Sequence, residues 1–253
     1  MTIGGDAVPQ YVSSKWKKTE ALLRNRSLQN IIPKTVRFNR IQLKTMLESS
    51  GMVYIKPDTG SYGNGVMRVE RKKGRYSFQA GERLRTFSTF DFLFEALRKE
   101  TKSRRYLIQR GIHLLKYKGR RFDLRVMVQL NPKKAWETTG IIGRVAAPRK
   151  IVTNFHNGGK PMSATRLLGQ HLNKQAMENK INSLEVLGVR TAKTLRRKFP
   201  GLRVIGLDVG MDPSLTPWIL EVNTNPDPYI FRKLPDPTIF RTIQRYAKAY
   251  GRK

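Results

Sequence analysis

The segment DVGMDPSLTPWILEVNTN, residues 208–225, contains two apolar runs joined by a turn. Residues 202–208 and 218–222 have the length and the β-branched or aromatic content that predict strands. Two proline-containing clusters between them, Asp-Pro-Ser and Thr-Pro, predict the turn. We therefore expect an antiparallel hairpin whose first strand carries an aspartate.

This hairpin brings three oxygen-bearing side chains together. If the strands pair, Asp208 and Glu221 face each other, and Asn223 shares the face of Glu221 because side chains alternate along a strand. Carboxylate and amide oxygens on a rigid sheet suit Mg²⁺, which often shares its coordination shell with substrate phosphates. The pattern predicts a metal site; the alternative is a surface hairpin with solvated acids.

The charge of the chain points to anionic partners. The 253 residues include 50 Lys and Arg against 18 Asp and Glu, and 50 − 18 gives a net charge of +32. A field of this sign attracts nucleic acid, anionic membrane, polyphosphate, nucleotides or an acidic protein tail. Charge alone does not choose among these classes.

Other features of the composition exclude several kinds of site. The chain has no cysteine and three histidines, which excludes disulfides, thiolate nucleophiles and cysteine-ligated zinc. Residues 1–12 are expected to form a loose arm without the features of a targeting peptide, and no apolar run approaches the ~18 residues of a membrane span. We therefore expect a soluble, cytoplasmic protein without a transmembrane segment.

Helical and strand-like patterns alternate irregularly along the chain, which favours an α+β fold over a doubly wound sheet. Between residues 163 and 198, Gly169 and Gly188 favour two helices over one. Helices are expected at 15–24, 41–47, 90–100 and 237–246, and strands at 35–38, 52–56, 66–69, 75–78, 106–109, 122–130, 138–146 and 150–155.

A glycine-rich turn follows a strand that ends in Lys56. Gly60, Ser61, Gly63 and Gly65 form this turn, and glycines let backbone N–H groups approach a phosphate while a nearby ammonium neutralises its charge. The segment is not a Walker A motif, because no Gly-Lys-Ser/Thr opens a helix. The alternative interpretation is an ordinary hairpin turn.

Two further segments carry candidate chemistry. Asp123 and Arg125 alternate along a predicted strand and so share a face, where a fixed guanidinium suits a triphosphate or a developing phosphate charge. The alternative is that Arg125 pairs with Asp123 or another acid on a solvated face. Residues 154–159, Asn-Phe-His-Asn-Gly-Gly, predict a loop that binds phosphate or substrate; the alternative is an ordinary connection between a strand and a helix.

The order of these features resembles the ATP-grasp fold over most of the chain. The resemblance implies that ATP is held between a small subdomain with the glycine-rich hairpin and a larger subdomain with the metal ligands. It assigns ATP binding to Lys15, Lys56, Gly60, Ser61, Gly63, Gly65, Gln109, Arg110 and Ile112, catalysis to Arg125, Arg144 and Asn154, and Mg²⁺ or Mn²⁺ to Asp208, Glu221 and Asn223. Lys17 or Lys18 is an alternative to Lys15, and the family commonly has Glu where Gln109 stands.

Three motifs are similar to the YheC/YheD family of endospore-forming bacteria, whose members are described as spore-coat-associated. They are Tyr54–Gly65, Arg121–Arg125 and Leu220–Pro226. The Phe-Asp-Leu-Arg strand also resembles tubulin tyrosine ligase relatives, which add amino acids to acidic protein tails. The region before the glycine-rich hairpin is short, so the expected division is a reduced lead-in at 1–50, a small subdomain at 51–112 and a large catalytic subdomain at 113–253.

The resemblance implies an ATP-dependent carboxylate–amine ligase that works through an acyl phosphate, and the positive charge suits an acidic peptide or protein acceptor. Two alternatives remain open. One is a non-catalytic ATP-binding protein associated with the spore coat. The other is a nucleic-acid-binding protein, which the charge permits although the basic residues are spread along the chain and no nucleic-acid motif is present.

Overall fold

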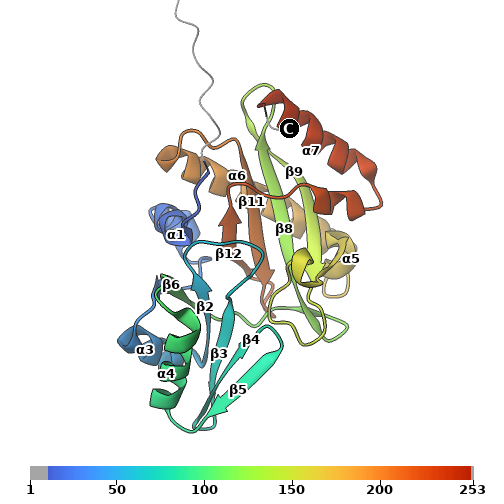
Figure 1. Ribbon diagram of the computed structural model, residues 1–253. Helices are drawn as coiled ribbons and strands as arrows, with labels where there is room; N and C mark the ends of the chain where they lie inside the picture. The colour runs from blue at the N-terminus through green and yellow to red at the C-terminus, as the bar shows by residue number, and fades with distance from the viewer. Residues whose placement is uncertain (1–10, 252–253) are drawn as a thin grey trace, which may run out of the picture.

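The computed structural model describes residues 11–251 and contains two antiparallel sheets, one below the other in Figure 1. The fold is therefore α+β, as expected. The strands of the first sheet, in spatial order, are β1 (Thr35–Arg37), β6 (Tyr106–Arg110), β2 (Met52–Pro57), β3 (Met67–Lys72), β4 (Arg75–Ala80) and β5 (Arg83–Phe87). The expected glycine-rich hairpin is confirmed as the β2–β3 connection.

Helices α3 (Arg40–Ser50) and α4 (Phe90–Thr101) cover one face of the first sheet. Because side chains alternate along a strand, Val53 and Ile55 of β2 pack beneath these helices, fully buried. Tyr54 and Lys56 of the same strand therefore point to the other face, toward the second sheet. The alternation thus divides β2 into a structural side and a side available for binding.

The second sheet is formed mostly by the C-terminal half of the chain. Its strands, in spatial order, are β10 (Lys160–Ser163), β9 (Trp136–Val145), β8 (Arg120–Leu130), β11 (Val204–Met211) and β12 (Pro217–Asn223), and β7 (Lys116–Tyr117) also pairs with β8. The helices around it are α1 (Lys15–Leu23), α2 (Arg26–Gln29), α5 (Ala164–Leu168), α6 (Lys174–Lys198) and α7 (Pro237–Ala249).

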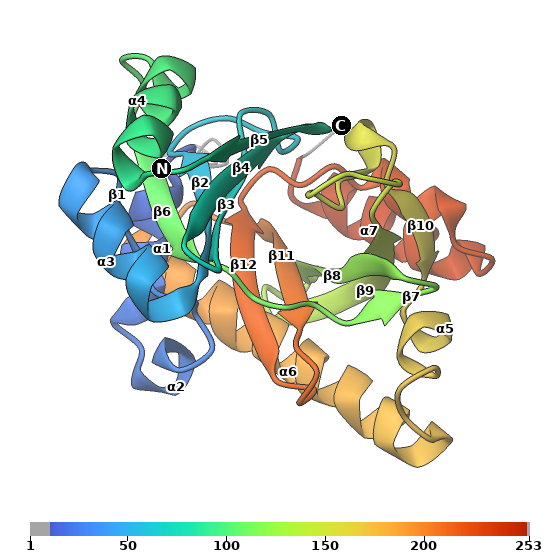
Figure 2. The same ribbon diagram turned by 90° about the horizontal axis from the view of Figure 1, so that it is seen from below.

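The central strand β8 is buried on both faces. Val126 and Val128 pack in the core that contains α1 and α6, whereas Met127 between them packs with α7. Helices α6 and α7 therefore cover opposite faces of the second sheet (Figure 2). Helix α7 covers one end of its face, and the other end of that face lies against the first sheet (Figure 1).

Most helices begin where a side chain caps the free backbone N–H groups of the first turn. Ser14, Asn39 and Asn173 accept such hydrogen bonds at the starts of α1, α3 and α6. Asp236 does the same for α7, which has Pro237 in its first turn. These caps fix where the helices begin.

Two expected elements differ from the structure. Residues 150–155 were expected to form a strand but lie in a loop that leads into a short 3-10 helix, Phe155–Asn157. The strand β10 follows at Lys160–Ser163 instead. The region 163–198 does contain two helices, and the break between them lies near Gly169. Gly188 lies inside α6, where it allows the helix to pack closely on β8, because a Cβ at this position would come within 2.8 Å of Val128.

The hairpin predicted from residues 208–225 is present as β11 and β12. Asp208 and Glu221 are register partners, and Asn223 is paired with Gly206. The two acids therefore face each other across neighbouring strands, as expected. None of the helices within residues 11–251 is both long and apolar enough to span a membrane.

Candidate functional site

A cavity of about 680 Å³ lies between the two sheets. The first sheet contributes polar side chains from β2 and β6, and the second sheet contributes charged side chains from β8, β9, β11 and β12. The segment after β2 and the loop before β10 close the remaining side of the cavity. The predicted site residues among its lining are Lys56, Gly63, Gln109, Arg110, Ile112, Arg144, Asn154, Asp208 and Glu221.

Lys56 and Gln109 form the polar contact on the side of the first sheet. The ammonium of Lys56 donates a hydrogen bond of 2.7 Å to Gln109 Oε1. Gln109 Nε2 donates in turn to Thr35 Oγ1 and to the carbonyl of Leu220, both at 3.3 Å. Burial lowers the pKa of Lys56, and the charge of Glu221 partly opposes this effect.

Four alternating charges form a row on the second sheet. Arg144 Nε donates to Asp123 Oδ1 at 2.9 Å, and Arg144 also lies 3.0 Å from Asp208 Oδ2. Arg125 pairs with the same Asp208 through two of its nitrogens, one of them at 3.1 Å from Oδ2. All four side chains are buried. Arg125 thus pairs with Asp208, in a buried site rather than on the solvated face of the alternative interpretation.

The row follows from the strand register. Asp123 faces Arg144 across β8 and β9, and Asp208 faces Arg125 across β8 and β11. Gly206, two residues before Asp208, leaves room for Pro226 and the Arg125 side chain, because a Cβ there would lie 2.7 Å from Pro226 Cβ and 3.1 Å from Arg125 Cδ. The sequence therefore builds this charge row from alternation on three adjacent strands.

The electrostatics of the row stabilise the ionised forms. Burial by itself raises the pKa of Asp208, but Arg125 and Arg144 outweigh it, and the pKa is held below its usual value. Burial likewise lowers the pKa of Arg144, but Asp123 and Asp208 raise it above the usual value of an arginine. Both groups are charged near neutral pH.

The glycine-rich segment and the loop before β10 meet over the cavity. Gly63 packs so closely that a Cβ would lie 3.0 Å from Asn154 Oδ1 and 3.3 Å from Val152. The amide of Asn157 donates to the carbonyl of Tyr62. The segment after β2 therefore contacts the loop that contains Asn154, and the two close one side of the site.

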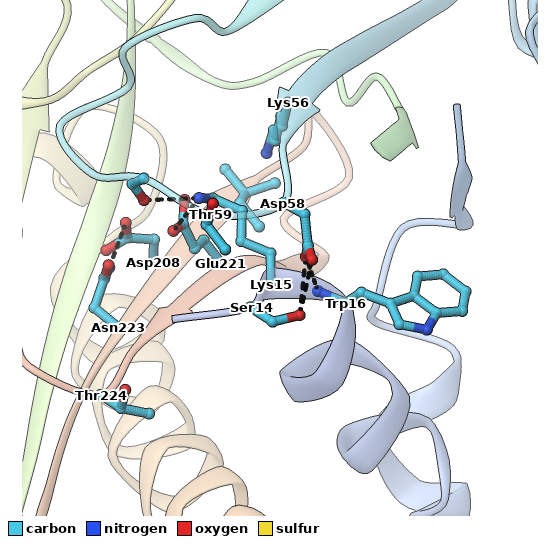
Figure 3. A network of polar contacts seen from close by, with 12 residues as sticks. Ser14, Lys15, Trp16, Lys56, Asp58, Thr59, Asp208, Glu221, Asn223 and Thr224 are labelled. Atoms are coloured by element: carbon cyan, nitrogen blue, oxygen red, sulfur yellow. Dashed lines mark hydrogen bonds and ion pairs between the residues drawn. The ribbon is translucent and has the colours of Figure 1, made fainter. Parts of the chain in front are cut away.

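The N-terminal lysines approach the site from α1. Lys15 Nζ donates to the carbonyl of Gly60 at 2.9 Å and lies 3.6 Å from Glu221 Oε1 (Figure 3). Lys18 is buried nearby, and desolvation lowers its pKa to about 8 even though Glu221 favours its charged form. Lys17 is exposed. Lys15 and Lys18, but not Lys17, line a second cavity of about 450 Å³ that also contacts Lys56 and Glu221.

A third cavity, of about 590 Å³, adjoins the first and shares Arg144 and Asn154 with it. Its walls bring together the charge row and the aromatic rings of Tyr62 and His156, whose centroids lie 4.1 Å apart. Three further predicted site residues line it: Ser61, Arg125 and Asn223. The remaining two, Gly60 and Gly65, do not line these three cavities, although Gly60 accepts the hydrogen bond from Lys15.

The predicted metal ligands have suitable chemistry. Asp208, Glu221 and Asn223 offer two carboxylates and an amide oxygen, which are donors that hard divalent cations prefer. Among residues 11–251 no three His, Cys, Asp or Glu side chains gather in one group, so the amide is needed to complete the set. Asp208 is already held by two arginines, so a cation bound there would share the carboxylate with them or displace one of them.

Sequence reasoning missed several contributors to this site. Asp123 was considered only as a partner of Arg125, although it holds Arg144. Asp58 and Thr224, which hydrogen-bond residues on either side of Lys15, were not noticed because their partners lie 42 or more residues away in sequence. The alternation of Asp123 with Arg125 was the available signal; no local signal marked Asp58 or Thr224.

Comparison with protein families gives a match over nearly the whole chain. The family model described as YheC/D like ATP-grasp matches residues 7–252. Two curated relatives from Bacillus subtilis (strain 168) are similar in sequence. Endospore coat-associated protein YheD is 24% identical over 225 residues, which are 86% of this chain and 49% of YheD.

Endospore coat-associated protein YheC is 21% identical over 217 residues, which are 84% of this chain and 59% of YheC. The chain therefore spans between about half and three fifths of the length of these two relatives. The match alone therefore does not assign the activity of the complete relatives to this chain.

Two solved structures share the fold. The C-terminal domain of K. lactis Pby1, an ATP-grasp enzyme that interacts with the mRNA decapping enzyme Dcp2, gives a TM-score of 0.51 at 14% identity, covering 93% of this chain and 72% of that one. D-cycloserine synthetase DcsG gives a TM-score of 0.56 at 11% identity, and the match covers 94% of this chain and 70% of DcsG. At these identities the likeness shows the ATP-grasp fold.

Proposed function

Because this chain belongs to the YheC/D-like ATP-grasp family, we propose that it is an ATP- and Mg²⁺-dependent carboxylate–amine ligase. One observation carries the proposal: cationic and acidic side chains from both sheets converge on a single cavity. Lys56 comes from the first sheet, and Arg144, Asp208 and Glu221 come from the second.

In this proposal the cations neutralise the phosphates. Lys15 and Lys56 bind the triphosphate, and Arg125 and Arg144 face the transferred phosphoryl group from the adjoining cavity. Mg²⁺ or Mn²⁺ held by Asp208, Glu221 and Asn223 supplies further charge neutralisation and orientation of the phosphates. In this proposal Gln109, Arg110 and Ile112, which line the main cavity, contact the adenine, as the resemblance implies.

The reaction proceeds in two transfers. A substrate carboxylate oxygen attacks the γ-phosphorus, the bond to the bridging oxygen breaks, and ADP leaves with an acyl phosphate formed. An amine nitrogen then attacks the acyl carbon, phosphate leaves, the nitrogen loses a proton, and an amide results. No side chain of the site becomes covalently attached to substrate, so the residues act by positioning and by charge stabilisation.

The charge of the chain supports an acidic peptide or protein as the acceptor. With a net charge of +32, the surface attracts polyanions and raises their rate of encounter. The names of the two B. subtilis relatives support association with the spore coat. Nucleic acid remains the less favoured polyanionic partner.

A non-catalytic ATP-binding role is the second candidate. The observation that favours it is the double ion pairing of Asp208, which occupies a proposed metal ligand with Arg125 and Arg144. ATP binding with no ADP formation in the presence of acidic peptides and amines would support this role over the ligase.

The test is calorimetric titration with ATP, with and without Mg²⁺, on the wild type, Glu221→Gln and the control Glu137→Gln. Glu137 accepts a hydrogen bond from Tyr246 and does not line the three cavities. We expect metal-dependent binding that only Glu221→Gln weakens, followed by ADP release with an acidic acceptor. Equal binding by Glu221→Gln would remove the metal assignment, and a wild type that fails to bind ATP would remove the proposal.

A further inference from the structure

Residues 12–16 connect the two sheets by hydrogen bonds at both ends. At one end, the N–H of Val12 donates to Thr224 Oγ1 at 3.0 Å, and the Thr224 hydroxyl lies 3.2 Å from the carbonyl of Val12. Thr224 directly follows β12 of the second sheet. This end of the segment is buried.

At the other end the segment is fastened to Asp58, which directly follows β2 of the first sheet. The carboxylate of Asp58 accepts the amide of Trp16 at 2.8 Å and the hydroxyl of Ser14 at 3.0 Å. The N–H of Lys15 donates to the carbonyl of Asp58 at 2.9 Å. Figure 3 shows these contacts beside the candidate metal ligands.

The side chain of Lys15 extends from this segment into the site. Its ammonium lies between the carbonyl of Gly60, in the glycine-rich segment, and the carboxylate of Glu221, on β12. Ordering a lysine side chain costs about 2 kcal/mol of rotamer entropy. A mobile backbone would add to this cost, so a fixed backbone at Lys15 favours a defined position for its ammonium. Asp58 fixes the backbone on both sides of the Lys15 α-carbon, through the amides of residues 15 and 16.

Asp58 itself does not line the three cavities around the site, so it touches neither substrate nor cofactor in the proposed reaction. Its carboxylate also lies at the start of α1, where a negative charge stabilises the helix. Stabilisation of α1 would follow even if Asp58 were only a structural residue. A measurement of ATP affinity is therefore needed to separate helix stabilisation from the positioning of Lys15.

We infer that Asp58 is a positioning residue that holds Lys15 between the glycine-rich segment and Glu221, and that residues 12–16 thereby fasten the two sheets together around the nucleotide. The inference rests on the proposed function. It adds to that function the contact of Asp58 with residues 14–16, which keeps Lys15 between the glycine-rich segment and Glu221.

The test is a double-mutant cycle on ATP affinity in the presence of Mg²⁺, with the wild type, Asp58→Asn, Lys15→Met and the double variant. We expect each single substitution to weaken binding about tenfold and the double variant to bind no more weakly than Lys15→Met, because Asp58 acts through Lys15. Asp236→Asn is the control: the Asp236 carboxylate accepts a first-turn N–H of α7, and Asp236 does not line the three cavities.

Asp236→Asn is expected to lower the melting temperature without changing ATP affinity. If Asp58→Asn does not fold, Ser14→Ala and Thr224→Val, which remove the hydroxyl contacts at the two ends of the segment, are expected to weaken binding in the same direction. Wild-type affinity in Asp58→Asn, or losses that multiply in the double variant, would overturn the inference while leaving the proposed function intact. A wild type that does not bind ATP would overturn both.

Discussion

Arg144 and Asp208 form an ion pair of 3.0 Å although their strands, β9 and β11, are not neighbours in the sheet. The guanidinium reaches across β8, where it also holds Asp123, its register partner. The carboxylate of Asp208 is thus shared by two guanidiniums, within a row that has no net charge. Removal of one member leaves a buried charge without its partner, which costs far more than the loss of an exposed pair.

Arg144→Met is therefore expected to lower the free energy of unfolding by about 3–5 kcal/mol. Asp208 keeps Arg125, but Asp123 loses the partner that the structure gives it. Urea denaturation measures the change. Arg98→Met is the control, because Arg98 pairs with Glu95 on the exposed surface of α4 and its loss should cost less than about 0.5 kcal/mol. Similar losses in both variants would contradict a buried role for the row.

The glycine-rich segment gives a second prediction. Gly63 and Gly74 have the same backbone angle, φ +74°, so alanine pays a similar conformational cost of roughly 1–2 kcal/mol at either position. Only at Gly63 does the new methyl group press on Asn154 and Val152; at Gly74 no atom lies within 4 Å. Gly63→Ala should weaken ATP binding about tenfold, because the two loops over the cavity are forced apart.

Gly74→Ala is expected to lose comparable stability and to bind ATP like the wild type. Thermal unfolding and ATP titration on the same samples separate the two effects. Equal ATP affinity in both variants would show that the contact between Gly63 and Asn154 does not shape the site.

Lys18 gives a prediction on pH. Its pKa falls from 10.5 to about 8 in the folded protein, mainly because it is buried. Below pH 8 the lysine is charged in both states, and folding carries the full cost of burying the charge. Between pH 8 and 10.5 the unfolded state binds the proton and the folded state does not, so this contribution makes stability rise with pH. At about 1.4 kcal/mol per pH unit the cost is ~3 kcal/mol.

Lys18→Met removes this cost. The variant is expected to exceed the wild type in free energy of unfolding at pH 7, and the difference should shrink to nothing by about pH 10.5. Denaturation curves for both proteins from pH 7 to 10.5 measure it, and the other titrating groups cancel in the comparison. A difference that does not change with pH would show that Lys18 titrates normally.

The fold was largely predictable from the sequence because its elements carry local signals. The hairpin of residues 208–225 has turn residues between apolar runs, and the pairing that these predict allowed Asp208 and Glu221 to face each other. Where local signals mislead, packing explains the outcome. Gly188 reads as a helix breaker, but α6 needs it for close approach to Val128 on β8.

The site was less predictable, because its contacts depend on which strands become neighbours. The residue type at Arg125 suggested phosphate binding, and the family resemblance assigned Arg144 to catalysis. The structure brings both to the walls of the adjoining cavities. Their partners required the register of β8 with β9 and with β11, which no local pattern in the sequence reveals. The contact of Asp58 with Trp16 likewise depends on how the first sheet meets α1.

Arg110 supplies the last prediction. Among residues 11–251, its Nε is the buried side-chain nitrogen or oxygen atom that has no hydrogen-bond partner, and it belongs to a residue that lines the main cavity. The guanidinium lies over the ring of Trp218, 4.5 Å from its centroid. This contact fixes the position of the side chain but gives the Nε–H no hydrogen-bond acceptor. A buried donor without an acceptor costs about 1–3 kcal/mol, and an acceptor on the nucleotide would recover this.

Arg110→Met should therefore change the free energy of unfolding of the nucleotide-free protein by less than about 1 kcal/mol, since the lost stacking is offset by removal of the unsatisfied donor. ATP affinity should fall about tenfold. Arg68→Met is the control: Arg68 lies on the same sheet but bonds Glu70 at 2.6 Å, so its loss should reduce stability and leave ATP affinity unchanged. Chemical denaturation and ATP titration of both variants measure the two effects. If Arg110→Met destabilises the protein as Arg68→Met does and binds ATP normally, Arg110 is a structural residue and its Nε does not await a ligand.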